Sequence, residues 1–141
     1  MLYVIVFSKC KEQSTEPKEG KFTDPYFLLW QSKNIHNYSY DQTIYSYGNY
    51  DKTRIQVRND TINDIMNFRD STSMAIKYWS QYCTIENWFQ RIEDFKADTL
   101  CRIKCRYDTL YGYPCSVTTD YIYGTDLGNL YILTNLIIKN P

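Results

Sequence analysis

The cysteines and the single histidine are the residues best able to do chemistry in this chain of 141 residues. Cys101 and Cys105 lie four positions apart, Cys115 follows, and His36 adds an imidazole; thiolates and imidazoles are ligands that zinc prefers. The segment around the first pair, however, alternates apolar and charged residues as a strand does. Residues four apart in a strand are separated by roughly 13 Å, whereas two zinc thiolates must each lie within about 2.3 Å of one ion. We therefore predict no metal site, and the same separation excludes a Cys101–Cys105 disulfide.

Other catalytic chemistry has few candidates. Any nucleophile–base pair that needs a histidine must use His36, which lies in a polar stretch where a lone histidine is usually solvated. The chain contains no glycine-rich phosphate loop, nucleophile elbow or paired-histidine metal motif. The sequence therefore predicts a protein that is not an enzyme and takes no cofactor. A hydrolase that uses only carboxylates stays open as an alternative.

Two segments, residues 53–59 and 100–107, carry cations at alternate positions and apolar residues between them. Such alternation predicts a strand with one buried and one solvated face. If both strands bury their apolar side against the same helices, five cations lie on one exposed face: Arg54, Arg58, Arg102, Lys104 and Arg106. A neighbouring strand adds two aromatic rings, Tyr45 and Tyr47.

This predicted face has three interpretations. A solvated sheet face ordinarily carries Arg, Lys and Gln. Cations beside stacking rings also suit single-stranded nucleic acid. Tyr and Arg are, in addition, enriched in the residues that dominate protein–protein binding. We predict a protein partner first, because 16 basic and 16 acidic side chains give no net charge for attracting a nucleic acid. Tyrosine supports this choice, since its 15 residues are about twice the usual share.

The elements that must position this face follow from the hydrophobic spacing. Helical spacing predicts helices from Thr61 through Met66, over residues 74–82, and after Thr84, where the apolar stripe is clearest. Period-two or continuous apolar runs predict the strands, which are residues 2–7, 26–30, 100–107, 117–123 and 130–138, together with a hairpin over 43–59 that turns near Gly48.

This order of strands, helices and strands predicts an α+β domain in which two or three helices cover one face of a mainly antiparallel sheet. The length predicts a single domain over residues 1–141. Residues 9–25 are polar and contain two prolines and a glycine, so we predict a mobile loop or linker there. Acidic residues fall mostly in this linker and in the helices, which predicts that cations are concentrated on the sheet.

The compartment is constrained less strongly. No run approaches the ~20 apolar residues that span a bilayer, so we predict no transmembrane segment. Residues 2–7 followed by Cys10 have some features of a lipoprotein signal, but the apolar run is short and lacks a basic start. We therefore favour a buried strand and an intracellular protein. The exported alternative would leave four cysteines for two disulfides: Cys83, Cys101, Cys105 and Cys115.

Overall fold

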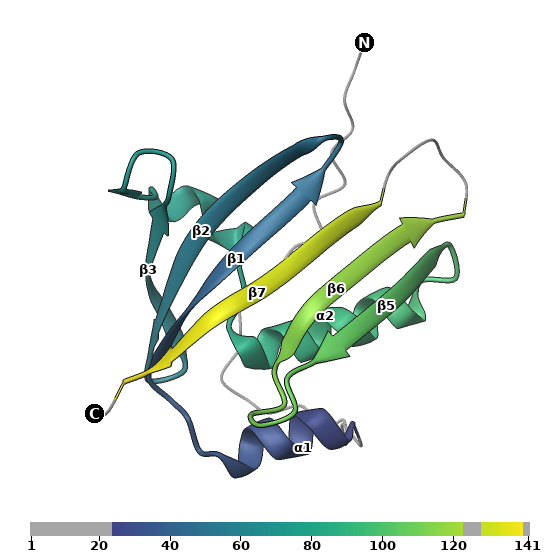
Figure 1. Cartoon of the computed structure of the whole chain (residues 1–141), viewed down its shortest axis with the longest axis horizontal. Helices are drawn as coiled ribbons and strands as arrows, with labels where there is room; N and C mark the ends of the chain where they lie inside the picture. The colour runs from purple at the N-terminus through teal and green to yellow at the C-terminus, as the bar shows by residue number, and fades with distance from the viewer. Residues whose placement is uncertain (1–23, 123–127, 140–141) are drawn as a thin grey trace.

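A computed structural model describes residues 24–122 and 128–139 of the chain. Its main feature is a seven-stranded antiparallel sheet in the order β4-β3-β2-β1-β7-β6-β5 (Figure 1). The strands are β1 (Tyr38–Ser46), β2 (Asn49–Arg58), β3 (Thr61–Asn67), β4 (Thr72–Ser73), β5 (Cys101–Tyr107), β6 (Pro114–Tyr121) and β7 (Asn129–Ile138). The helices are α1 (Pro25–Ser32), the short 3₁₀ helix η1 (Ile76–Gln81) and α2 (Ile85–Ala97).

The prediction of an α+β domain with one sheet face covered by two or three helices is wrong, because the described chain is mostly β. Only α2 is a long helix, and it packs against β5 and β6. Its apolar stripe is buried as predicted, from Ile85 through Trp88 to Phe95. The segment at 74–82 forms only η1, which contains no buried residue.

A β-bulge explains why the helix predicted from Thr61 is a strand. Val57 pairs with Ile62 and Ile55 pairs with Ile65, and the register shifts between these pairs. The extra residue places two isoleucines three positions apart on the same face of β3, so their spacing resembles that of a helix. Pairing with β2 decides the conformation of this segment.

Helix α1 replaces the strand predicted at residues 26–30, because capping outweighs the apolar run. The carboxylate of Asp24 accepts hydrogen bonds from the backbone N–H of Tyr26 at 2.8 Å and of Phe27 at 3.4 Å. Pro25 occupies the first helical position, where its fixed φ angle favours a helix. Only Trp30 of this helix is fully buried.

Glu86 at the start of α2 connects three elements. Its carboxylate accepts hydrogen bonds from Trp30 Nε1 of α1 at 2.6 Å and from the Tyr38 hydroxyl of β1 at 3.0 Å. The same hydroxyl oxygen accepts the backbone N–H of Ile85, and burial raises the pKa of Tyr38 far above its ordinary value. Polar groups that would be costly to bury alone are therefore paired.

Several other predictions have clear outcomes. The strands at 100–107 and 130–138 are confirmed as β5 and β7, and the hairpin as β1 and β2. Cys101, Cys105 and Cys115 are free thiols, and Cys83 is buried. None of the described helices has the length and apolar character needed to cross a membrane. The predicted strand at 2–7, Cys10 and nearly all of the predicted linker at 9–25 lie outside the described residues; its last two positions, Asp24 and Pro25, begin α1.

We predict that Gly112→Ala destabilises the fold more than Gly48→Ala does. Both glycines have positive φ, +85° and +75°, which costs an L-residue roughly 1–2 kcal/mol. A Cβ at Gly112 would also overlap the Tyr26 carbonyl oxygen of α1, whereas one at Gly48 would meet open space. Adding roughly 1–3 kcal/mol for this overlap predicts a total of about 2–5 kcal/mol for Gly112→Ala, measured as the free energy of unfolding in urea. Equal losses in the two variants would contradict this packing of α1 on the Gly112 turn.

Candidate functional site

The candidate site lies on the face of the sheet opposite the buried core, which we call the outer face. In β2, Thr53, Ile55 and Val57 are buried toward the core, so Arg54 and Gln56 project outward. In β5, Arg102, Lys104 and Arg106 are exposed while the residues between them are partly buried. The alternation predicted from the sequence is therefore present in both strands.

The strand register aligns residues from five strands across this face. Tyr50 of β2 pairs with Tyr45 of β1, Tyr45 with Leu130 of β7, Leu130 with Thr118 of β6, and Thr118 with Lys104 of β5. Directly paired residues project to the same face of a sheet. A row thus runs from two tyrosines to a lysine across the full width between β2 and β5.

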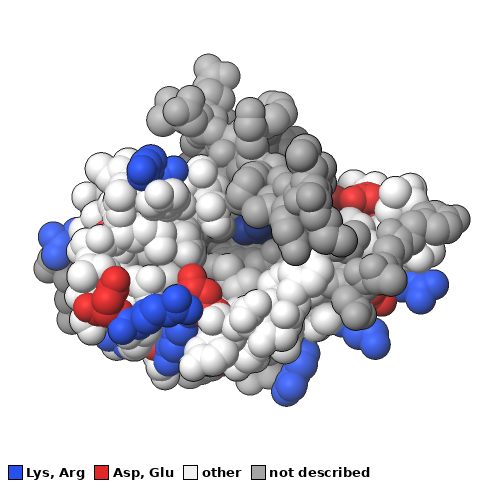
Figure 2. All heavy atoms as spheres, turned by 90° about the horizontal axis from the view of Figure 1, so that it is seen from above, with Lys and Arg blue, Asp and Glu red and all other residues white. Residues whose placement is uncertain are grey.

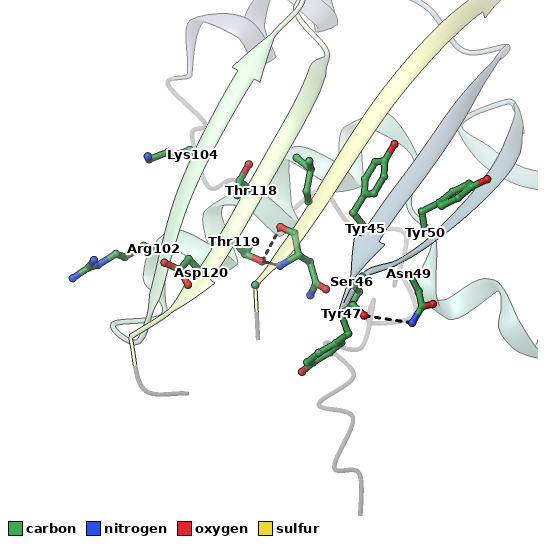
Figure 3. A pocket seen from close by; sticks show the side chains of 14 residues that line it. Tyr45, Ser46, Tyr47, Asn49, Tyr50, Arg102, Lys104, Thr118, Thr119 and Asp120 are labelled. Carbon is green, nitrogen blue, oxygen red and sulfur yellow. Dashed lines mark hydrogen bonds between the residues drawn. The ribbon is translucent and has the colours of Figure 1, made fainter. Parts of the chain in front are cut away.

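A hollow of about 940 Å³ lies along this row. Figure 3 shows Tyr45 and Tyr50 on one side of it and Arg102 and Lys104 extending outward from β5 on the other. This one hollow is lined by four of the predicted site residues. Tyr45 and Tyr47 come from the first hairpin, and Arg102 and Lys104 come from β5, about sixty positions later in the chain. The complete lining is Tyr45, Ser46, Tyr47, Gly48, Asn49, Tyr50, Arg102, Lys104, Thr118, Thr119, Asp120, Gly128, Asn129 and Leu130.

The tyrosines of the hollow are exposed. Tyr45, Tyr47 and Tyr50 retain 45%, 63% and 66% of their accessible surface. The rings of Tyr45 and Tyr50 lie 6.0 Å apart with 34° between their planes. These rings form an aromatic surface that solvent or a ligand can reach.

Tyr47 has an unfavourable backbone conformation. Ser46 pairs with Asn49, so Tyr47 and Gly48 form a two-residue hairpin turn, and their φ angles are +51° and +75°. A type I′ turn requires positive φ at both positions and normally has Asn or Asp before Gly. A bulky tyrosine at the first position is strained, and strain of this kind is concentrated at functional sites.

Arg54 lies outside the hollow and is already paired. Its Nε donates to Asp41 Oδ1 at 2.7 Å and its Nη2 to Oδ2 at 3.2 Å, and the guanidinium lies over the ring of Phe68. The Asp41 side chain is 1% exposed and also accepts a 2.7 Å hydrogen bond from Asn135. Lys52 is 3.7 Å from the same carboxylate. Most of the charge of Arg54 is therefore neutralised within the protein.

Two further predicted cations, Arg106 and Arg58, also lie outside the hollow. Arg106 is exposed on β5 but does not line the hollow, and Arg58 lies at the end of β2 away from the hairpin turn. Three strands separate β2 from β5, a distance of about 19 Å between strand axes. The strand parity places all five cations on the outer face, but they are spread over it and do not form one cluster.

Carboxylates also lie on the outer face. Asp120 is paired with Arg102 across β5 and β6, and Asp64 is paired with Gln56 across β2 and β3. With Asp41, they contradict the predicted separation of acids from the sheet. Figure 2, which views the molecule from above relative to Figure 1, shows both basic and acidic side chains on the described surface.

Sequence reasoning missed Asp120, Thr118 and Leu130 as residues of the site. A signal for the first two was present, because the buried Val117 and Thr119 alternate with Thr118 and Asp120. Leu130 lies in an apolar run that gives no indication of which side chains face outward.

The lining supplies rings, hydroxyls, two cations and one carboxylate, which suit binding. The single histidine is at the other end of β1, where His36 Nδ1 lies 2.9 Å from the Asp60 carboxylate.

We predict that Asp41→Asn lowers the free energy of unfolding at pH 7 by about 1–3 kcal/mol, because Arg54 and Lys52 lose a buried anionic partner. Burial raises the pKa of Asp41, but hydrogen bonds from Arg54 and Asn135 and the nearby positive charges outweigh burial, so the pKa is lowered overall. A lowered folded-state pKa contributes stability above the unfolded-state value of about 4, and this stability is lost as the pH falls through the folded-state pKa.

The wild-type protein should therefore lose stability below about pH 5, and Asp41→Asn should lose less over the same range. Urea unfolding at a series of pH values measures both slopes. Asp64→Asn is the matched control, since its carboxylate is only partly buried and accepts one described hydrogen bond, from Gln56. Identical pH slopes for the wild type and Asp41→Asn would contradict the assignment.

Comparison with known proteins identifies a family. The model of DUF6174, a family of unknown function, matches residues 24–135, a span that begins at the N-cap of α1 and ends within β7. No curated protein and no solved structure matches the chain significantly. The matched span covers most of the chain and includes every residue that lines the hollow. The chain therefore belongs to the DUF6174 family, a family of unknown function.

Proposed function

We propose that this protein is a small non-catalytic interaction protein that docks a protein partner in the hollow on its outer face. The observation that carries the proposal is the convergence of Tyr45, Tyr47, Tyr50, Arg102 and Lys104 around one hollow. Tyr and Arg are the side chains that most often dominate protein interfaces, because they combine large contact areas with hydrogen bonding. The strain at Tyr47 supports the same conclusion, since Asn would fold this turn more easily.

A protein fits the hollow better than a single-stranded nucleic acid does. Binding of a phosphate backbone depends on several uncompensated cations. The hollow has two cations, and the carboxylate of Asp120, which lies opposite Arg102 in the strand register, adds a negative charge beside them. Arg54 is held by Asp41 on the same face. Rings, hydroxyls and charges of both signs are better suited to a protein surface of mixed polarity.

We predict that Tyr45→Ala reduces capture of the partner by about tenfold or more, the usual effect of truncating a dominant interface tyrosine. The measurement is capture by the tagged full chain from nuclease-treated extract of the native source, quantified by mass spectrometry. Tyr78→Ala is the matched control, because Tyr78 is 49% exposed on η1 and does not line the hollow.

The wild type and Tyr78→Ala should capture the same protein, and Tyr45→Ala should lose it. Equal capture by all three chains overturns the proposal. If the wild type captures the protein from untreated extract but not from nuclease-treated extract, the hollow binds nucleic acid instead.

We also predict that Tyr47→Asn stabilises the fold by about 1 kcal/mol while it weakens capture of the same partner. Asn tolerates positive φ better than tyrosine does, so the substitution relieves strain in the turn. Tyr47→Phe is the control, because it keeps both the ring and the strain, and its stability should equal that of the wild type. Unfolding in urea gives the stability of each variant. A more stable Tyr47→Asn variant with unchanged capture would show that Tyr47 does not contact the partner.

A further inference from the structure

β5 is the long edge of the described sheet. The sheet ends at β4 on one side and at β5 on the other. β4 has only two residues, whereas β5 has seven. An edge strand presents a row of unpaired backbone groups to which a further strand can pair. A two-residue edge offers too few of these groups, so β5 is the edge that can accept a strand.

The backbone of β5 has free groups in the required direction. The N–H of Ile122 donates to the carbonyl oxygen of Leu100, so the backbone groups of Leu100 and of alternate residues after it point toward β6. Those of Ile103 and Cys105 therefore point away from the sheet. Neither residue donates its backbone N–H to another described residue on that side. With respect to the described residues, two amides and two carbonyls are thus available along the edge.

The side chains of β5 select the charge of an added strand. Arg102, Lys104 and Arg106 are all exposed on the outer face, and none forms an ion pair with another described residue. Like charges directly opposite each other in a sheet repel, and opposite charges attract. A second copy of β5 aligned antiparallel would oppose cation to cation. A strand with carboxylates at alternate positions would place each of them opposite a cation.

We propose that β5 accepts an extended acidic segment of a protein partner as an antiparallel eighth strand. The inference rests on the proposed function in one respect, that the ligand is a protein. The backbone of the segment pairs with Ile103 and Cys105, and its carboxylates pair with Arg102, Lys104 and Arg106 on the outer face. Lys104 also ends the row that contains Tyr45 and Tyr50, so the added strand places the partner beside the hollow. Main-chain hydrogen bonds provide affinity and the alternating side chains provide specificity.

The test uses a fluorescent seven-residue peptide with Glu at alternate positions and Val or Thr between them, titrated with the full chain and followed by anisotropy. In the antiparallel arrangement the Val and Thr amides face β5, and the Glu amides face away. N-methylation of the Val and Thr amides should weaken binding by at least about tenfold, and N-methylation of the Glu amides should change it by less than about twofold. These peptide controls do not depend on how well any protein variant folds.

A charge test is made on the protein. Lys104→Glu should weaken binding of the acidic peptide by about three- to tenfold, because it replaces an attraction with a repulsion. Lys77→Glu is the matched control, since it changes the net charge equally at an exposed position on η1 and should leave binding unchanged. A peptide in which only the Glu opposite position 104 is replaced by Lys should regain affinity for Lys104→Glu, because Arg102 and Arg106 still face carboxylates.

Three results overturn this inference: no binding of the acidic peptide, equal binding of both methylated peptides, or tighter binding of oligothymidylate at the same edge. Loss of binding confined to the Val and Thr methylations, together with the effect of Lys104→Glu, supports it. If the peptide does not bind but capture still depends on Tyr45, the proposed function stands and only the added strand is rejected.

Discussion

The insertion of β7 between β1 and β6 is the constraint on which the rest of the structure depends. β1 to β4 pair in sequence, and β5 and β6 form a separate hairpin, so neither part reaches the other without the last strand of the chain. β7 pairs with Tyr38–Ser46 on one side and with residues 116–119 on the other. Two of its side chains, Tyr131 and Leu133, are buried in the core. Leu130 projects to the opposite face and links Tyr45 to Thr118, so the hollow exists only after this strand has been placed.

Two polar arrangements on the outer face follow from that pairing. A register shift between β1 and β7 occurs near Asp41, and Asn135, at φ +54°, donates to the Asp41 carboxylate. Asp41 then holds Arg54 and Lys52, which would otherwise add two free cations to this face. Along β5, Asp120 lies opposite Arg102 in the strand register, but no described carboxylate forms an ion pair with Arg102, Lys104 or Arg106, so these cations stay available. Arg54 and Lys52 of β2 are paired and the cations of β5 are not paired within the described chain, because the two strands have different neighbours in the sheet. The sequence of either strand alone does not show which neighbours it has.

The sequence predicts those parts of the structure that depend on a single segment. The alternation of Arg102, Lys104 and Arg106 correctly identifies a strand with one exposed face, and the stripe after Thr84 identifies α2. Local spacing fails at Ile62 and Ile65, where a bulge produces the spacing of a helix, and at residues 26–30, where the Asp24 cap and Pro25 outweigh an apolar run. Only part of the candidate site could be predicted. Alternation shows which residue types project outward. The strand order decides which of them line the hollow and which, like Arg54, are held by Asp41.

The same strand order is the basis of the charge selectivity proposed for β5 in a protein without net charge. Sixteen acids and sixteen bases cancel over the whole chain, and long-range attraction of a highly charged ligand is therefore weak. At short range each strand has its own neighbours, so a partner that pairs with β5 encounters three exposed cations in a row. Strand pairing adds a geometric requirement, because a segment must be extended and acidic at alternate positions to satisfy both the backbone and the side chains. A compact acidic surface or a flexible acidic tail would meet only one of these requirements.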